Sequence, residues 1–315
     1  MKKLIFITVF LLLAVCLLAA CKPSGCDHVW SYNFDNAKHQ LVCRACGEEK
    51  EKEDHTLDED GACSVCEITP GVFYSVSEDG KYAEVTRYNG TATKVKLAKK
   101  YNGLPVRIIA ERAFSGNQTI TAVEISKSVT KIGEAAFEGC TNLASVLIPN
   151  SVTYIDYAAF TACDSLVSVV IPDSVTTLAD VVFWGCKGLT SVVIGDGVKT
   201  IGSSVFGSCV NLTSVEIGKS VTVIAEGAFR NCKALESIVI PDGVEKIHPM
   251  AFYQCSLLES IVIPESVTSF GHDAFKKCDN LAHVYYCGTR EQWLEIKGRN
   301  FLSKPEFHFE YDPKK

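Results

Sequence analysis

Two Cys-x-x-Cys pairs within residues 26–66 combine residue types and a spacing that can bind a metal ion. Cys43 and Cys46 form the first pair, Cys63 and Cys66 form the second, and 16 residues separate the pairs. Two thiolates three positions apart can bind one metal ion, and four thiolates complete a closed tetrahedral zinc site. This spacing predicts a structural zinc ion in a zinc-ribbon-like module that spans residues 26–67.

Three further residues of this region could join the metal site: Cys26, His28 and His55. Each Cys-x-x-Cys pair is then preceded by a histidine, as in two degenerate copies of one unit. A site that combined Cys26 and His28 with the first pair would leave the second pair and His55 one ligand short of four. Disulfides in an oxidising exterior and free thiols remain the alternatives to zinc.

A unit of 23 residues repeats from residue 106 to residue 286 and must form the framework of the chain. Phenylalanine marks each unit, at Phe114, Phe137, Phe160, Phe183, Phe206, Phe229, Phe252 and Phe275. A cysteine follows three residues later in every unit but the first, at Cys140, Cys163, Cys186, Cys209, Cys232, Cys255 and Cys278. Sequence periods of 20–50 residues are typical of solenoids and arrays, in which each unit is stabilised by its neighbours.

Each unit contains one stretch that alternates like a β-strand. In Leu143–Ile148 the pattern is Leu-x-x-Val-x-Ile, which predicts a short strand. Pro149 follows this stretch, and a proline cannot donate a hydrogen bond into a sheet. The segment Glu134–Gly139 is predicted to form a single helical turn on the opposite side. The cysteines three residues after each phenylalanine are expected to be buried and unpaired, because stacked side chains would run parallel rather than converge.

The repeating pattern resembles the leucine-rich repeats of bacterial BspA-like surface proteins. Residues 148–153 read Ile-Pro-Asn-Ser-Val-Thr and residues 240–244 read Ile-Pro-Asp-Gly-Val, and the resemblance covers about 215 residues. The resemblance implies a curved solenoid on the outside of a bacterium that takes part in adhesion or recognition. The predicted fold class is therefore an α/β repeat solenoid, a leucine-rich-repeat stack of short parallel strands with helical turns on the opposite side, preceded by a small cysteine-rich module.

The segments that flank the repeats are expected to cap the stack, because a bare terminal turn exposes strand edges. Residues 68–105 are predicted to form an N-terminal cap with an incomplete first repeat, and Asp79-Gly80 predicts a hairpin within it. Residues 287–315 are predicted to form a C-terminal cap. In this cap Thr289 and Gln292 fit a capping box that opens a short helix.

Residues 1–20 have the charged start and apolar core of a secretion signal. The following Leu18-Ala19-Ala20-Cys21 resembles the lipobox of bacterial lipoproteins. The resemblance implies cleavage before Cys21, lipidation of its thiol, and a tether over residues 21–25. Two acyl chains anchor a protein stably, which a single chain does not. A plain signal peptide and an uncleaved membrane anchor are the alternatives.

Charge and motifs limit the classes of function. The formal net charge is −6, and loss of Lys2 and Lys3 with residues 1–20 changes it to −8. Nucleic acid is not an expected partner because no basic stripe is present. We predict no enzyme, since the sequence contains no nucleophile elbow, phosphate loop or dinucleotide fingerprint.

Two rows of side chains are expected to point outward from the strands and to offer a ligand-binding surface. One row consists of Glu124, Leu147, Val170, Val193, Glu216, Val239 and Val262. The second row consists of Ser145, Ser168, Ser191, Ser214, Ser237 and Ser260. An exposed valine row is more apolar than a solvated sheet requires and indicates an interaction site. The alternative is that β-branched residues simply suit stacked strands.

These observations together predict a non-catalytic, lipid-anchored protein on the extracellular side of the cell envelope. Its partner would be an extracellular protein or glycan bound by the solenoid, and the lipid would attach it to the membrane. Structural zinc in residues 26–66 is the one cofactor expected. A structural spacer or envelope-assembly scaffold, and an accessory protein that works through the Cys/His metal module, are the alternative functions.

Overall fold

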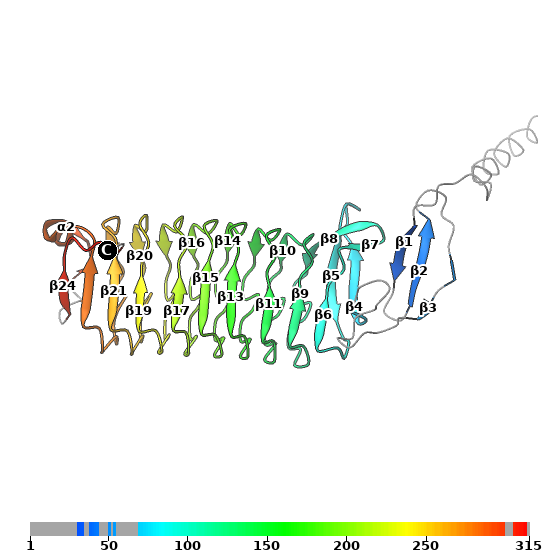
Figure 1. The fold of residues 1–315 in the computed structure, drawn as a ribbon, viewed down its shortest axis with the longest axis horizontal. Helices are drawn as coiled ribbons and strands as arrows, with labels where there is room; N and C mark the ends of the chain where they lie inside the picture. The colour runs from blue at the N-terminus through cyan, green and yellow to red at the C-terminus, as the bar shows by residue number, and fades with distance from the viewer. Residues whose placement is uncertain are drawn as a thin grey trace, which may run out of the picture. The chain divides into compact units, whose positions relative to one another are not determined.

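The computed structural model describes the backbone of residues 30–34, 38–43, 50–51, 53–54, 69–299 and 305–313, and side chains in 50–51, 69–299 and 305–313. The chain divides into two compact units, with the boundary between His55 and Thr56. In the smaller unit three strands pair antiparallel in sequence order (Figure 1). They are β1 (Trp30–Phe34), β2 (Lys38–Cys43) and β3 (Glu53–Asp54).

The larger unit is a β-solenoid of about ten turns, in which each repeat contributes two short strands (Figure 1). The first ladder consists of β6 (Lys94–Lys96), β9 (Ala122–Glu124), β11 (Ser145–Leu147), β13 (Ser168–Ile171), β15 (Ser191–Ile194), β17 (Ser214–Glu216), β19 (Ser237–Val239), β21 (Ser260–Ile263), β23 (His283–Tyr286) and β24 (Glu306–His308). The second ladder consists of β8 (Leu104–Ile109), β10 (Lys131–Ile132), β12 (Tyr154–Ile155), β14 (Thr177–Leu178), β16 (Thr200–Ile201), β18 (Val223–Ile224), β20 (Lys246–Ile247) and β22 (Ser269–Phe270).

Most neighbouring strands of each ladder pair in parallel with a register of one repeat, and the pairing is interrupted between β11 and β13, between β17 and β19, and between β14 and β16. Val169 lies opposite Val192, and Val192 lies opposite Val215 in the next turn. This pairing confirms the short strand predicted from the alternation in each unit. The second ladder was not predicted, because a two-residue strand is too short to show alternation in the sequence.

A column of phenylalanine rings fills the interior of the solenoid. The rings from Phe114 to Phe275 stack with centroid separations of 4.8–5.6 Å and interplanar angles of 3–15°. Phe183, in the middle of the column, is fully buried between its neighbours. Burial of large aromatic surface in every turn makes each repeat depend on contact with the next.

The predicted helical turn before each cysteine is wrong. Residues Glu134–Gly139 form non-helical turns, in which the amide of Phe137 donates to the carbonyl of Ala159 in the next repeat. The amide of Glu138, in contrast, donates to Ala135 three residues earlier. Because every second amide of the segment donates to a carbonyl of the next repeat, the segment cannot form the regular i to i−4 hydrogen bonds of an α-helix. Ala135 also has a φ of 50°, which no right-handed helix contains. The fold is therefore a β-solenoid rather than an α/β solenoid.

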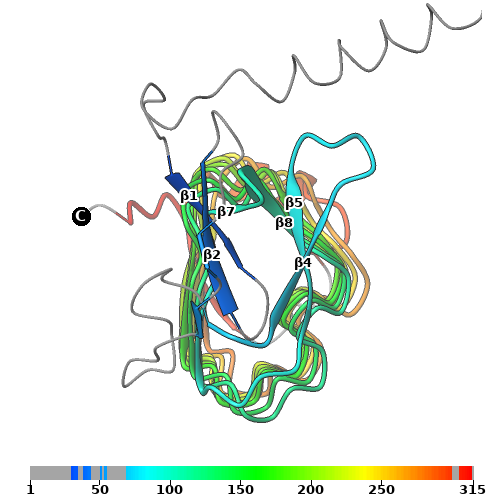
Figure 2. The ribbon, with the colours of Figure 1, turned by 90° about the vertical axis from the view of Figure 1, so that its right-hand side faces the viewer.

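At the N-terminal end of the solenoid, β4 (Val72–Val76) and β5 (Ala83–Tyr88) form the antiparallel hairpin predicted around Asp79-Gly80. Strand β5 pairs in parallel with β8 and so continues the second ladder to the end of the stack. Strand β7 (Lys100–Tyr101) pairs antiparallel with β8. In Figure 2, which looks along the stack, this hairpin lies at the near end of the superposed turns.

At the C-terminal end, helix α2 (Arg290–Glu295) begins at the predicted capping box, and it is the one α-helix among the described residues. The amide of Gln292 donates to the Thr289 hydroxyl, and the amide of Thr289 donates to the Gln292 side chain. The buried Trp293 of this helix contacts Phe270, Tyr286 and Phe307. These contacts cover the last turn with an aromatic cluster.

The cysteines of the repeats are free thiols, as predicted, and all except the half-buried Cys278 are buried. Burial raises the pKa of the Cys140 thiol to about 12. It also raises the pKa values of Cys209 and Cys232. Among the described residues, none of the helical structure has the length and apolar character of a membrane-spanning segment.

Candidate ligand-binding face

The first ladder brings the predicted outward residues into one continuous row. Strand pairing places Leu147 beside Glu124, and Val193 beside both Val170 and Glu216. Because side chains alternate along a strand, the residues on either side of each outward position point into the core. The outward row is therefore a consequence of register, as the sequence predicted.

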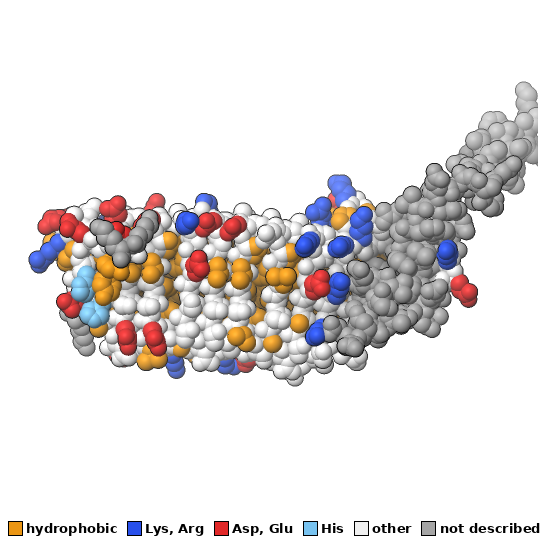
Figure 3. Space-filling view, in the orientation of Figure 1, with side chains coloured by type: hydrophobic (Ala, Val, Ile, Leu, Met, Phe, Trp, Pro, Cys, Tyr) orange, Lys and Arg blue, Asp and Glu red, His pale blue; other side chains and the backbone are white. Residues whose placement is uncertain are grey.

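Four aliphatic side chains of this row are exposed to solvent. The exposed fractions are 70% for Leu147, 58% for Val170, 52% for Val239 and 36% for Val193. Figure 3 shows hydrophobic side chains in a row along the middle of this face, interrupted by an acidic side chain. We call the surface formed by the two outward rows the ladder face.

Val262 differs from the other valines of the row, because only 9% of it is exposed. Strand β23 lies beside β21 and places the larger side chain of Tyr285 next to Val262. The 23-residue pattern treats Val239 and Val262 alike, so it does not predict this difference. Val262 therefore does not contribute to the exposed part of the row.

The predicted serine row also forms, on the same face. Ser168, Ser191 and Ser214 lie side by side in the register of β13, β15 and β17. Ser237 pairs with Ser260 in the same way further along. Ser145, Ser168, Ser214 and Ser237 are exposed, and Ser191 and Ser260 are half-buried. Hydroxyl groups thus flank the apolar row along most of its length.

The ladder face extends beyond the residues that the sequence predicted. At the N-terminal end Lys96 lies beside Glu124. At the C-terminal end Tyr285 and then His308 continue the valine row, while His283 and then Glu306 continue the serine row. The step of 23 residues continues from β23 into β24, but Gly298 and Phe301 replace the phenylalanine and cysteine that mark each repeat, so the pattern no longer signals this strand. The alternation in Glu306–His308 was the only local signal.

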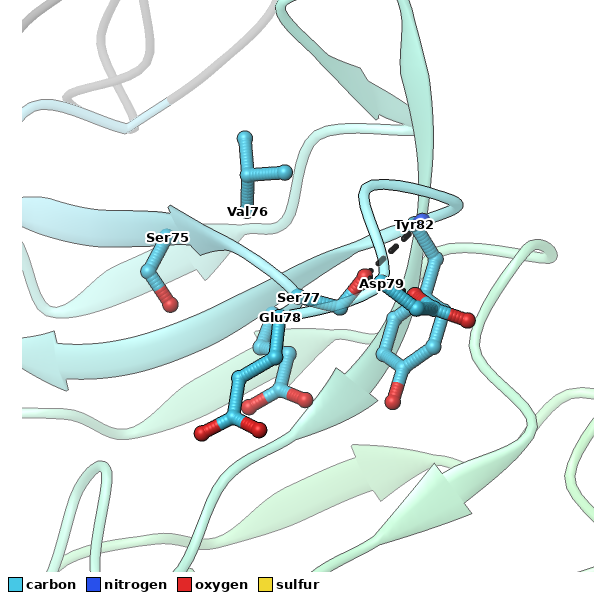
Figure 4. A pocket seen from close by; sticks show the side chains of 7 residues that line it. Ser75, Val76, Ser77, Glu78, Asp79 and Tyr82 are labelled. Atoms are coloured by element: carbon cyan, nitrogen blue, oxygen red, sulfur yellow. Dashed lines mark hydrogen bonds between the residues drawn. The ribbon is translucent and has the colours of Figure 1, made fainter.

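A hollow of about 480 Å³ lies at the hairpin of the N-terminal cap and is lined by Ser75, Val76, Ser77, Glu78, Asp79, Tyr82 and Glu84 (Figure 4). Asp79 accepts hydrogen bonds from the Ser77 hydroxyl at 2.7 Å and from the Lys81 amide at 3.1 Å. The hydrogen bond from the Ser77 hydroxyl is the main reason that the pKa of Asp79 lies below its usual value. These bonds hold the turn of the hairpin, so Asp79 has a structural role that needs no ligand.

The predicted lipidation site and metal ligands lie outside the residues whose side chains are described. This applies to Cys21, Cys26, His28, Cys46, His55, Cys63 and Cys66. For Cys43 the structure describes only the backbone, at the end of β2. Lipidation and zinc binding by these residues therefore stay predictions.

The two parallel ladders, the buried phenylalanine column and the 23-residue period define a leucine-rich-repeat solenoid. Residues 92–190 and 179–296 match the family described as BspA type leucine rich repeat region. The match covers more than half of the chain, so the chain belongs to the BspA-type leucine-rich repeat family. Repeats of this family are typically non-catalytic. A comparison with curated proteins finds no match.

Solved structures of bacterial leucine-rich repeat proteins are similar to this chain. The T. pallidum leucine rich repeat protein TpLRR is 30% identical, with a TM-score of 0.51, over 76% of this chain and 97% of its own. A leucine rich cell surface protein from Faecalibacterium prausnitzii A2-165 is 23% identical, with a TM-score of 0.38, over 72% and 96%. A leucine-rich repeat protein from Bacteroides capillosus is 29% identical, with a TM-score of 0.35, over 39% and 94%.

Proposed function

We propose that this protein is a cell-surface binding protein that holds an extracellular protein or glycan on its ladder face. The observation that carries the proposal is the row of exposed aliphatic side chains at Leu147, Val170, Val193 and Val239. Water-exposed apolar side chains that gather along one row favour contact with a partner. A spacer would be served equally well by polar residues at these positions.

The chemistry of the ladder face defines the kind of partner that it fits. Parallel strands lie about 4.8 Å apart, so the row offers one outward side chain at each such step, and most of these side chains are aliphatic. Serine hydroxyls beside it can donate and accept hydrogen bonds. Aliphatic rather than aromatic side chains dominate the middle of the row, which favours a protein partner over stacking on sugar rings. Glu216 interrupts the row between Val193 and Val239 and would select for a basic or hydrogen-bond-donating group there.

The test is a binding assay that compares matched variants of the full chain carrying Cys21→Ser, which prevents lipidation. The first variant carries Val170→Glu, Val193→Lys and Val239→Lys. With the native Glu216 this row alternates in charge, so opposite charges face one another across neighbouring strands. The control carries Tyr157→Glu, Trp184→Lys and Leu257→Lys, three exposed apolar residues in turns outside the strands. Both variants change the net charge equally.

Binding would be measured against a panel of extracellular-matrix proteins, glycans and bacterial surfaces. We expect the parent and the control to bind one component, and the ladder-face variant to lose at least tenfold in affinity while its circular dichroism spectrum stays unchanged. Equal binding by all three folded chains would place the contact elsewhere. Absence of binding by the parent across the panel would instead favour the spacer or scaffold function.

We further propose that Cys21 carries the lipid that attaches the protein to the membrane. The support is the apolar segment of residues 4–20 and the small residues directly before Cys21. Expression in a bacterium fed radiolabelled palmitate should label the native chain and leave Cys21→Ser unlabelled. Equal label in both chains would contradict lipidation at Cys21.

Structural zinc in residues 26–66 is the remaining part of the proposal, supported by the spacing of the two Cys-x-x-Cys pairs. Substitution of Co²⁺ for zinc distinguishes the alternatives, because thiolate ligands give intense charge-transfer absorption in the near ultraviolet. We expect this absorption in the parent and its loss in Cys63→Ser/Cys66→Ser. Disulfides would instead leave the four cysteines resistant to alkylation until a reductant is added.

A further inference from the structure

Three side chains that can bind a metal ion meet where the ladder face ends. Parallel pairing of β23 with β24 places His283 directly beside Glu306, and Tyr285 beside His308. Residues 283 and 285 share one face of their strand, as residues 306 and 308 do on theirs. His283, Glu306 and His308 therefore project from the same side, where Figure 3 shows the histidine side chains next to acidic and hydrophobic ones.

The separations between the three donor atoms are close to those of a tetrahedral metal site. His283 Nδ1 lies 3.3 Å from His308 Nε2. Glu306 Oε2 lies 3.6 Å from His283 Nδ1 and 4.0 Å from His308 Nε2. Zinc bonds of about 2.0–2.2 Å at tetrahedral angles place two donors about 3.3–3.5 Å apart. The two imidazoles are already at this separation, and the carboxylate would need to move by roughly half an ångström.

From this geometry we propose that His283, Glu306 and His308 form a binding site for a divalent transition-metal ion, with zinc as the best-suited ion. Two imidazole nitrogens and one carboxylate oxygen favour Zn²⁺ and its neighbours over Mg²⁺ and Ca²⁺, which require oxygen ligands. Three protein ligands leave one position of a tetrahedral site open. A water molecule, or a donor from a partner bound to the ladder face, would fill this position.

Neighbouring aromatic rings hold one of the ligands in place. The Tyr285 ring stacks on the His308 imidazole with centroids 4.5 Å apart and 16° between the planes. Tyr311 packs against Tyr285 from a distance of 4.6 Å. Such packing reduces the conformational entropy that a ligand loses when a metal binds. The ligands also remain accessible, because the side chains of His283 and His308 are 42% and 34% exposed.

A hydrogen bond between the two imidazoles is the competing explanation for their approach. It requires one ring to donate and the other to accept, and Glu306 would then pair with whichever ring gains a proton. This arrangement needs no metal, so it predicts no metal affinity. A direct measurement of metal binding therefore distinguishes the two explanations. Neither explanation depends on whether the ladder face binds a partner.

The experiment is a Zn²⁺ titration by calorimetry of the full chain carrying Cys21→Ser, after removal of metal by a chelator. The site variant carries His283→Ala and His308→Ala. The control carries His248→Ala and His272→Ala, two exposed histidines outside the cluster, so both variants have the same number of histidines. Because the Cys/His module is unchanged in every chain, a difference in Zn²⁺ stoichiometry reports only the proposed site.

We expect the site variant to bind one equivalent of Zn²⁺ fewer than the parent and the control. A second variant, Glu306→Gln, should keep the fold and weaken that equivalent at least tenfold. The difference spectrum between the Co²⁺-loaded parent and the Co²⁺-loaded site variant should show weak visible bands without thiolate absorption, because the Cys/His module contributes equally to both chains. Equal stoichiometry and affinity in all four chains would overturn the proposal and leave the imidazole pair as a hydrogen bond only.

Discussion

The Sγ atom of Cys186 donates a hydrogen bond to the carbonyl oxygen of Phe160, one turn earlier in the solenoid, across 3.1 Å. The equivalent thiols from Cys140 to Cys278 make the same contact at 3.0–3.2 Å. Thiols are weak donors, and a small apolar group with one donor suits a buried position beside a carbonyl. The contact explains why cysteine recurs three residues after phenylalanine without forming disulfides.

Replacement of one ladder thiol should therefore destabilise the fold. We expect Cys186→Ala to lower the free energy of unfolding by about 1–2 kcal/mol, because it removes a hydrogen bond and leaves a small buried cavity. Urea denaturation followed by circular dichroism measures the effect. Cys287→Ala is the matched control, since Cys287 lies outside the ladder and is only half-buried. Equal costs at the two positions would contradict a role for the thiol contact.

Buried thiols should make the solenoid sensitive to alkaline pH. Burial raises the pKa of Cys140 from its ordinary value of 9.0 to about 12. Between these two values the Cys140 thiol keeps its proton in the folded state and loses it in the unfolded chain. The contribution of this thiol to the free energy of unfolding is therefore complete below about pH 9 and declines as the pH rises toward 12. We expect the urea midpoint to decrease between pH 8 and pH 10.5, and Cys140→Ala to reduce the slope.

Alkylation gives an independent check of the same burial. At pH 8.5 iodoacetamide should modify the half-buried Cys287 well before Cys140 or Cys232, because only an accessible thiolate reacts. Mass spectrometry of peptides from the native and the urea-unfolded chain resolves the sites. Modification of Cys140 as fast as Cys287 in the native chain would show that the ladder opens readily.

The phenylalanine column predicts where the solenoid is most vulnerable. Phe183 stacks between Phe160 and Phe206 with centroid separations of 5.3 and 5.6 Å and has no exposed surface. We expect Phe183→Ala to cost about 3–5 kcal/mol and Phe183→Leu less than about 1.5 kcal/mol. Because stability in a solenoid is a sum over neighbouring turns, hydrogen exchange should increase most in the turns adjacent to residue 183. Uniform exchange along the stack would instead indicate one cooperative unit.

The helix of the C-terminal cap begins at a capping box made by two side chains. Thr289 accepts a hydrogen bond from the amide of Gln292, whose side chain in turn accepts from the Thr289 amide. We expect Thr289→Ala to cost about 1 kcal/mol and Thr289→Ser much less, since serine retains the capping oxygen. Thermal unfolding compares the two variants, and equal melting temperatures would show that the buried Trp293 alone fixes this helix.

Much of the fold was predictable because its signals are local or repeat at a fixed step. The alternation in Leu143–Ile148, the hairpin around Asp79-Gly80 and the capping box at Thr289 each depend on residues close in sequence. Contacts between turns were not predictable in this way. The amide of Phe137 bonds to Ala159 of the next repeat, and this bond rules out the helix that the local sequence favoured.

The candidate site was predictable only as far as the phenylalanine and cysteine that mark each repeat extend. The period placed Val170 and Val193 side by side on the outer face, as the structure has them. The same step of 23 residues relates His308 to Tyr285, but the next unit has Gly298 in place of the marker phenylalanine and so hides the relation in the sequence. Sites made by the terminal strands of a repeat protein are thus hidden where the marker residues are lost, even though the step of the repeat continues.

Val239 and Val262 occupy equivalent positions on neighbouring strands, yet their exposed fractions are 52% and 9%. Replacement of valine by threonine keeps the shape and the β-branch of the side chain and adds a hydroxyl group. The substitution therefore tests how deeply the side chain is buried. We expect Val239→Thr to change the free energy of unfolding by less than about 0.5 kcal/mol, whereas Val262→Thr should cost about 1–2 kcal/mol by burying a hydroxyl. Urea denaturation distinguishes these values.

Tyr285 should be the residue that makes the two valines differ, because its strand places it directly beside Val262. When Tyr285→Ala is present, residue 262 gains exposure. The hydroxyl group introduced by Val262→Thr would then reach water. The cost of Val262→Thr should then decrease to that of Val239→Thr, which a double-mutant cycle measures as a coupling of about 1 kcal/mol. An unchanged cost in the Tyr285→Ala background would mean that contacts within β21, rather than the cap strand, bury Val262.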